Sequence, residues 1–165
     1  MKLNLKAIDI ASYFINKDVS PLKLQKLLYY SQLWFYVKNG EFLFEEKIRA
    51  WIYGPVVYEV WDKFRYMKRS DLIPKNRANN TGTNAITPHL DEVWDAYGHL
   101  SGSQLVDLSH AELPWKNSRK GLLINQPSDN EVMINVYTII DFSLDKFNKV
   151  PIIESVKSLG HYSNI

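Results

Sequence analysis

The chain of 165 residues contains no cysteine. Disulfide bonds, thiolate nucleophiles and cysteine-based zinc sites are therefore excluded. Glycine is also scarce, with 7 residues, and neither phosphate-binding pattern, GxGxxG or GxxxxGK, occurs. No apolar run approaches the roughly 20 residues that span a bilayer, and the N-terminal stretch has no uninterrupted apolar segment of the secretory type. We expect a cytoplasmic protein with no membrane partner.

Strong charge of either sign is missing as well. Lysine and arginine total 20 against 18 acidic residues, which leaves a net charge of +2. Such a balance does not by itself indicate a nucleic-acid or membrane partner. Aromatic residues, by contrast, make up 13% of the chain. Their large side chains allow a single domain of this length to bury a substantial core.

The first half of the chain predicts two helices. The first spans residues 4–16, with Asn4 as a candidate cap. The second starts at Ser20-Pro21 and ends at Asn39-Gly40. Its apolar positions recur at helical spacing around most of the circumference, so we expect it to be largely buried. The positions are Leu24, Leu27, Leu28, Tyr30, Ser31, Trp34, Phe35 and Val37.

A short strand is predicted before Gly54, because apolar Ile48, Ala50 and Ile52 alternate with Lys47, Arg49, Trp51 and Tyr53. We expect Gly54 to end this strand and Pro55 to start another helix. That helix would bury Val57, Val60, Trp61 and Phe64. Trp51 and Tyr53 fall on the opposite face of the strand from Ile48. They either cover a second small core or form an exposed patch of the kind that binds proteins.

The second half predicts further helices. Residues 68–86 are polar and indicate a loop that ends in a brief strand. Start signals follow at Thr87-Pro88, at the capping box Ser101–Gln104, at Pro114-Trp115 and at the capping box Ser128–Glu131. We predict a mainly α fold: a single compact helical domain over residues 1–150 with a small β-ribbon, and a loosely held tail over residues 151–165.

No catalytic or metal site emerges from the titratable residues. The four histidines, His89, His99, His110 and His161, form no HxxxH or HExxH pair, and the acidic pairs 45–46 and 91–92 are adjacent residues that do not face each other. We expect no cofactor, no metal and no enzymatic activity. His110 precedes a Pro-Trp break, where it either hydrogen-bonds carbonyls at the end of its helix or contacts a partner or substrate.

Residues 62–77 carry six basic side chains and two acidic ones. Arg65, Lys68 and Arg69 are the candidates for contact with a nucleic-acid backbone. A solvated helix end and an acidic protein partner explain the same pattern. A regulator that binds nucleic acid, for example at its own operon, is therefore an alternative function and not the favoured one.

Two separated motifs stand out in the chain. The first comprises residues 23–30 (KLQKLLYY), an aromatic helix and residues 50–57 (AWIYGPVV). The second comprises residues 105–110 (LVDLSH) followed by residues 114–116 (PWK). In this order they resemble a known family, the Panacea domain of SocA-like antitoxins and phage-associated proteins. The resemblance covers roughly residues 5–148. Ser109 stands where threonine is common in the family.

The resemblance implies a mainly helical, non-enzymatic protein that acts as the antitoxin of a toxin–antitoxin module. It would neutralise a cognate toxin by direct binding, and it leaves open delivery of that toxin to a ClpXP-type protease. The residues that we expect at the partner-binding corner are Trp51, Tyr53, Gly54, Pro55, His110 and Trp115.

Overall fold

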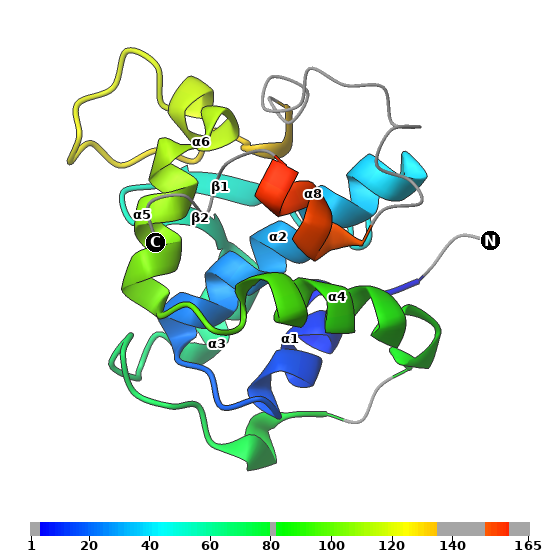
Figure 1. The fold of residues 1–165 in the computed structure, drawn as a ribbon. Helices are drawn as coiled ribbons and strands as arrows, with labels where there is room; N and C mark the ends of the chain where they lie inside the picture. The colour runs from blue at the N-terminus through cyan, green and yellow to red at the C-terminus, as the bar shows by residue number, and fades with distance from the viewer. Residues whose placement is uncertain (1–3, 80–81, 135–150, 159–165) are drawn as a thin grey trace.

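The computed structural model describes residues 4–79, 82–134 and 151–158 (Figure 1). Its elements, in chain order, are α1 (Ala7–Ile15), α2 (Pro21–Asn39), β1 (Ile48–Trp51), β2 (Gly54–Val57), α3 (Tyr58–Phe64), the 3-10 turns η1 (Lys75–Arg77) and η2 (Asn84–Ile86), α4 (Thr87–Tyr97), α5 (Gly102–Ala111), α6 (Leu113–Ser118) and α8 (Ile152–Ser158). The predicted fold class is confirmed: a mainly α, compact domain with one small antiparallel sheet.

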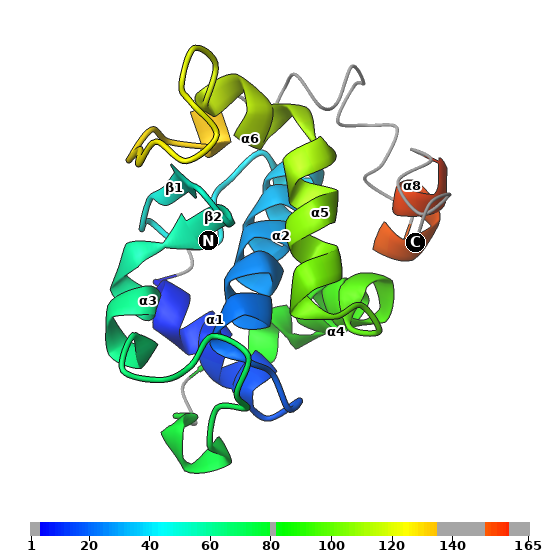
Figure 2. The same cartoon turned by 90° about the vertical axis from the view of Figure 1, so that its left-hand side faces the viewer.

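Helix α2 is the centre of the fold. It contacts α1, α3, α4, α5 and β2, and Figure 2 shows it between the sheet on one side and α5 on the other. Ser20 Oγ accepts a hydrogen bond from the Lys23 N–H at 3.2 Å, and Gly40 ends the helix at φ 68°. Both predicted boundaries are confirmed. Every residue from Leu24 to Phe35 is buried.

The sheet pairs β1 with β2 in the register Ile48↔Val57 and Trp51↔Gly54, with a two-residue turn between them. The expectation that Pro55 starts a helix is therefore wrong. Pro55 pairs with Ala50 inside β2, and α3 begins only at Tyr58. The Gln25 side chain holds this extended backbone, because its amide accepts from the Val57 N–H (2.8 Å) and donates to the Val57 carbonyl (3.3 Å).

The other edge of β1 is covered by residues 130–132. The Ala50 N–H donates to the Asn130 carbonyl, and the Val132 N–H donates to the Ile48 carbonyl, both at 2.8 Å. Glu131 pairs with Arg49 in this bridge. The predicted capping box at Ser128–Glu131 is therefore wrong at Glu131. The predicted helix beyond it lies, from residue 135 onward, outside the described residues.

Two other predicted helix starts shift by a few residues. Helix α1 begins at Ala7, and its first turn is closed by Asp9, which accepts from the Lys6 N–H at 2.9 Å, so Asn4 is not the cap. Thr87 is the first residue of α4 rather than its cap. The Ser101–Gln104 capping box is confirmed. Residues 68–79 and 82–86 contain the two 3-10 turns and no strand.

The tail contains α8, which packs on α4 (Figure 1). Ile152 and Val156 have no exposed surface. The prediction of a loosely held tail is wrong for these residues, because two apolar side chains four positions apart bury one face of the helix. None of the helices in the described ranges is long and apolar enough to cross a bilayer.

Candidate functional site

The end of α5 and the start of α6 meet the turn between β1 and β2. The Trp115 indole N–H donates to the Trp51 carbonyl at 2.8 Å. The His110 ring stacks on Trp115 with centroids 3.9 Å apart and an interplanar angle of 12°. The His110 ring also lies close to the backbone of Ile52. The structure thus brings the predicted corner residues together, and we call residues 51–55, His110 and Trp115 the corner.

His110 does not cap its own helix, because its partner is the turn rather than a carbonyl at the end of α5. Its Nε2 atom is buried and has no hydrogen-bond partner in the described part of the chain. Burial lowers the pKa of His110, and the positive charge of Lys26 lowers it further. The imidazole is therefore neutral near pH 7 and acts here as a flat ring that joins α6 to the turn.

Gly54 is required at its position by two independent constraints. Its φ of +102° is a conformation that side chains oppose. A Cβ there would also stand 2.7 Å from Lys26 Cε and 2.9 Å from Ser109 Oγ, both closer than normal contact.

Lys26 lies behind the corner with no exposed surface. Its amine donates to the Pro55 carbonyl at 3.1 Å, and no carboxylate pairs with it among residues 4–79, 82–134 and 151–158. Burial lowers its pKa from 10.5 to about 7. Sequence reasoning missed this residue, since a lysine on a helix ordinarily faces solvent. The signal was the apolar stripe around α2, which leaves little surface for Lys26.

The outer face of the corner is aromatic. Trp51 and Trp61 meet at 5.0 Å between ring centroids in an edge arrangement, and Tyr58 lies 5.7 Å from Trp61. Tyr53 is 53% exposed and Trp51 is half-buried, so of the two residues Tyr53 is the one that faces solvent. The prediction that Trp61 is a core residue is wrong. Helix α3 buries Val60 and Phe64 instead, which leaves Trp61 half-buried at the surface.

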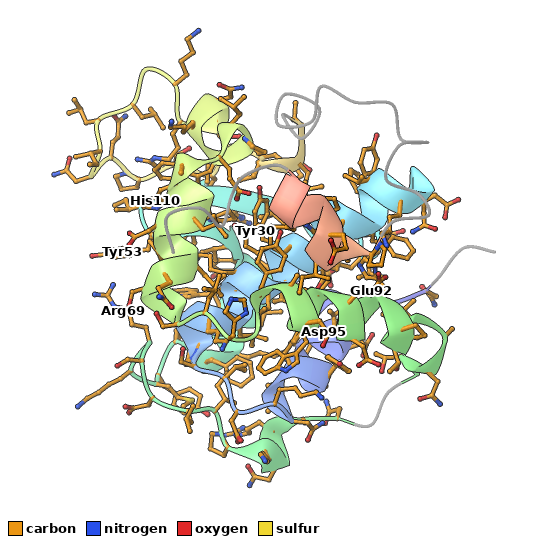
Figure 3. The ribbon with its side chains drawn as sticks, viewed as in Figure 1. Tyr30, Tyr53, Arg69, Glu92, Asp95 and His110 are labelled. Carbon is orange, nitrogen blue, oxygen red and sulfur yellow. The ribbon has the colours of Figure 1, made fainter. Side chains whose placement is uncertain are left out.

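The basic residues divide into two groups. Arg69 lies over the Tyr53 ring at 4.3 Å, and Arg65 lies over the Trp61 ring at 5.9 Å. Lys68, between them in sequence, is exposed and does not line the same surface. Figure 3 shows His110, Tyr53 and Arg69 on one side of the molecule, opposite Glu92 and Asp95. Two of the three predicted cations thus join the aromatic face.

A pocket of about 690 Å³ opens beside the corner. Its walls come from the first turns of α2, the β1–β2 turn, α3 with the segment after it, and residues 127–129. Apolar atoms dominate the wall. The charged side chains that line it are Lys26, Arg65, Arg69 and Asp129. We call it the corner pocket.

Among the residues that the structure describes, Asp129 is the only acidic side chain that lines the corner pocket. Its carboxylate accepts from the Trp51 indole N–H at 3.1 Å and from the Arg49 guanidinium at 3.2 Å. These hydrogen bonds, with the charge of Arg49, lower the pKa of Asp129. Asp129 is therefore already paired, and the remaining charge of the wall is positive.

The remaining candidates for catalytic or metal chemistry can also be placed in the parts of the chain that the structure describes. No group of three or more metal-ligating side chains gathers in these segments. Ser109 is buried, and its hydroxyl donates to the Val106 carbonyl at 3.0 Å. His89 bonds the Ser31 carbonyl at 2.9 Å inside the core, and His161 lies outside the described residues.

Residues 24–116 match the family described as antitoxin SocA-like, Panacea domain. The match covers more than half of the chain and contains most of α2, the sheet, Lys26, His110 and Trp115. Neither a curated protein nor a solved structure matches the chain. On the strength of the family match, the chain belongs to the SocA-like antitoxin family with a Panacea domain.

Proposed function

We propose that this protein is an antitoxin that neutralises a cognate protein toxin by binding it directly, and that the corner with its pocket is the binding surface. Membership of the SocA-like antitoxin family is the observation that carries the role. The placement of the surface rests on Tyr53, Trp51 and Trp61, which present aromatic area beside a concave, largely apolar wall. Aromatic and arginine side chains dominate the energetics of protein interfaces.

The rigidity of the corner supports the same surface. The turn is held from behind by Lys26 and Gln25, and from the side by Trp115 and His110. A surface that is already ordered loses little conformational freedom when a partner binds. The exposed aromatic side chains are thus presented at fixed positions.

The test is co-expression with the protein encoded by the adjacent open reading frame, scored by growth and then by co-purification. We expect the neighbour to be toxic alone, tolerated with this chain, and recovered in a complex with it. Tyr53→Ala and Trp51→Ala should weaken the complex at least tenfold. Phe42→Ala is the matched control, because Phe42 is 50% exposed and does not line the corner pocket. A neighbour that is neither toxic nor bound would contradict the antitoxin role.

The same experiment distinguishes two modes of neutralisation, occlusion of the toxin and its delivery to a protease. Rescue by occlusion requires a stable complex and leaves the toxin level unchanged. Delivery to a ClpXP-type protease gives rescue without a stable complex, and the toxin then disappears only in cells that contain the protease. The family resemblance is what brings the second mode into consideration, and growth in a protease-deficient strain decides between them.

Binding of nucleic acid is the alternative function. Arg65 and Arg69 lie against aromatic rings and line a largely apolar pocket, which favours a protein partner over a phosphate backbone. Nucleic-acid binding should weaken steeply with salt and be lost when Arg65, Lys68 and Arg69 are all replaced by glutamine. If retention on promoter DNA changed neither with salt nor in the triple glutamine variant, this result would count against nucleic-acid binding through these residues.

A further inference from the structure

The corner pocket combines an apolar wall with the positive charges of Arg65 and Arg69. Its volume of about 690 Å³ lies within the range of small-ligand sites, roughly 300–1,000 Å³. Leu22, Val56, Trp61 and Phe64 contribute apolar wall from three different elements. One large apolar side chain of a partner, with its neighbouring backbone, is accommodated by such a volume.

The basic side chains of the wall differ in whether an acidic side chain pairs with them. Arg69 makes no ion pair in the described ranges, and Lys26 bonds only the Pro55 carbonyl. Arg65 pairs with Asp62 at 3.4 Å, but both side chains are about half exposed, so that pair is weak. Asp129 is occupied by Trp51 and Arg49.

The guanidinium groups of both arginines lie close to aromatic rings of the same surface. Arg69 is held over Tyr53 and Arg65 over Trp61. A guanidinium group beside an aromatic ring gains a cation–π contact, and its N–H groups can still pair with both oxygens of a carboxylate. The apolar wall and the carboxylate-binding groups therefore adjoin each other.

We propose that the corner pocket binds a segment of a protein partner in which a large apolar side chain stands next to a carboxylate. The apolar side chain enters between Trp61 and Phe64, and the carboxylate pairs with Arg65 and Arg69. The identity of the partner as a toxin rests on the proposed function. The chemistry of the segment does not, because it follows from the pocket alone.

The test uses two synthetic peptides, acetyl-Asp-Trp-Leu-Glu-amide and its neutral counterpart acetyl-Asn-Trp-Leu-Gln-amide. Each is titrated into the full-length, ¹⁵N-labelled protein at low salt, and the protein's indole N–H signals are followed by NMR. We expect the acidic peptide to shift the signals of Trp51 and Trp61. The signal of Trp34, which is buried against Tyr97, should not move. The neutral peptide should bind at least fivefold more weakly.

Variants of the arginines test whether these residues cause the difference in affinity between the acidic and the neutral peptide. Arg69→Gln should reduce affinity for the acidic peptide about fivefold and leave affinity for the neutral peptide unchanged. Lys68→Gln is the matched control, since it removes one positive charge from the same exposed segment outside the pocket. An equal loss in both variants would mean general charge attraction and would overturn the proposal. Equal binding of the two peptides, or no binding of either, would overturn it as well.

A failure of the pocket assignment can be distinguished from a failure of the antitoxin proposal. If the toxin co-purifies undiminished with the Arg65→Gln/Arg69→Gln variant, the pocket assignment fails and the antitoxin role stands. If the acidic peptide binds as expected but the adjacent gene product does not, the pocket assignment stands and the antitoxin role fails for that partner.

Discussion

The amine of Lys26 donates to the carbonyl oxygen of Pro55 at 3.1 Å, in a place with no exposed surface. This bond joins the central helix to the second strand of the sheet. An amine that is buried without a carboxylate is costly to protonate. The free energy of unfolding therefore depends on pH through the titration of Lys26.

Replacement of Lys26 by methionine should make stability less dependent on pH. Burial lowers the pKa of Lys26 from 10.5 to about 7, so between those values the unfolded chain holds a proton that the native state lacks. Native stability therefore rises with pH across this window. Relative to wild type, Lys26→Met should be most favourable below pH 7, and its advantage should fall by up to about 5 kcal/mol as pH approaches 10.5.

Urea denaturation at pH 6, 8 and 10 measures this difference. Loss of the hydrogen bond to Pro55 adds an offset that does not depend on pH, so the slope is the informative quantity. His110 and Ser109 on α5 lie near Lys26 and remain in both proteins. The exposed Lys68→Met variant should show no such slope. A flat difference between Lys26→Met and wild type would refute the shifted pKa.

Gly54→Ala should destabilise the protein by about 2–4 kcal/mol, because it combines an unfavourable φ with steric overlap. The matched control is Gly121→Ala, where φ is +86° but nothing lies within 4 Å of the added Cβ. That variant carries the backbone cost alone, about 1 kcal/mol. Chemical denaturation of the two variants separates overlap with Lys26 and Ser109 from backbone strain. Equal losses would show that close packing at Gly54 is unimportant.

Trp115→Phe should cost about 1–2 kcal/mol, since the Trp51 carbonyl loses its indole donor while the ring stacked on His110 is retained. Faster hydrogen exchange at the amides of the β1–β2 turn should accompany the loss. Trp94→Phe provides the comparison, because Trp94 is also half-buried but its indole N–H bonds nothing in the described segments. Unchanged exchange at the turn would mean that Trp115 does not fix the corner.

Ile152→Ala should cost about 2–4 kcal/mol, because the side chain is fully buried where α8 packs on α4. Glu154→Ala, at an exposed position of the same helix, should change stability by less than about 0.5 kcal/mol. Thermal denaturation of both variants tests whether residues 151–158 belong to the domain. A boundary at residue 150 would be supported instead if Ile152→Ala melted like wild type.

The parts of the fold that sequence predicts are those specified locally. Ser20-Pro21 and Gly40 bound α2 through capping geometry that depends only on adjacent residues, and both were predicted correctly. Pro55 was misassigned because a proline after glycine suits a helix start and an edge strand equally. The Gln25 amide, which is distant in sequence, decides for the strand.

The sequence indicates which residues form the corner, but it does not predict how they contact one another. Trp51, Tyr53, His110 and Trp115 stand out by residue type and by their place beside breaks. Their mutual contacts depend on α5 crossing the turn, which no local pattern encodes. Lys26 was missed because burial of a lysine is a tertiary outcome. The pairing of Arg69 with Tyr53 was missed for the same reason.

The hydrogen bonds that fix the backbone of β2 come from side chains in the core. The side chains that face solvent contribute few bonds to the fold. Gln25 and Lys26 fix the backbone of β2 from within the core, whereas Tyr53, Arg65 and Arg69 are exposed. Substitutions at those three exposed positions therefore change the chemistry of the surface without removing the hydrogen bonds that Gln25 and Lys26 make to β2. If the corner binds the toxin as we propose, a small number of surface replacements could change the partner with little loss of stability.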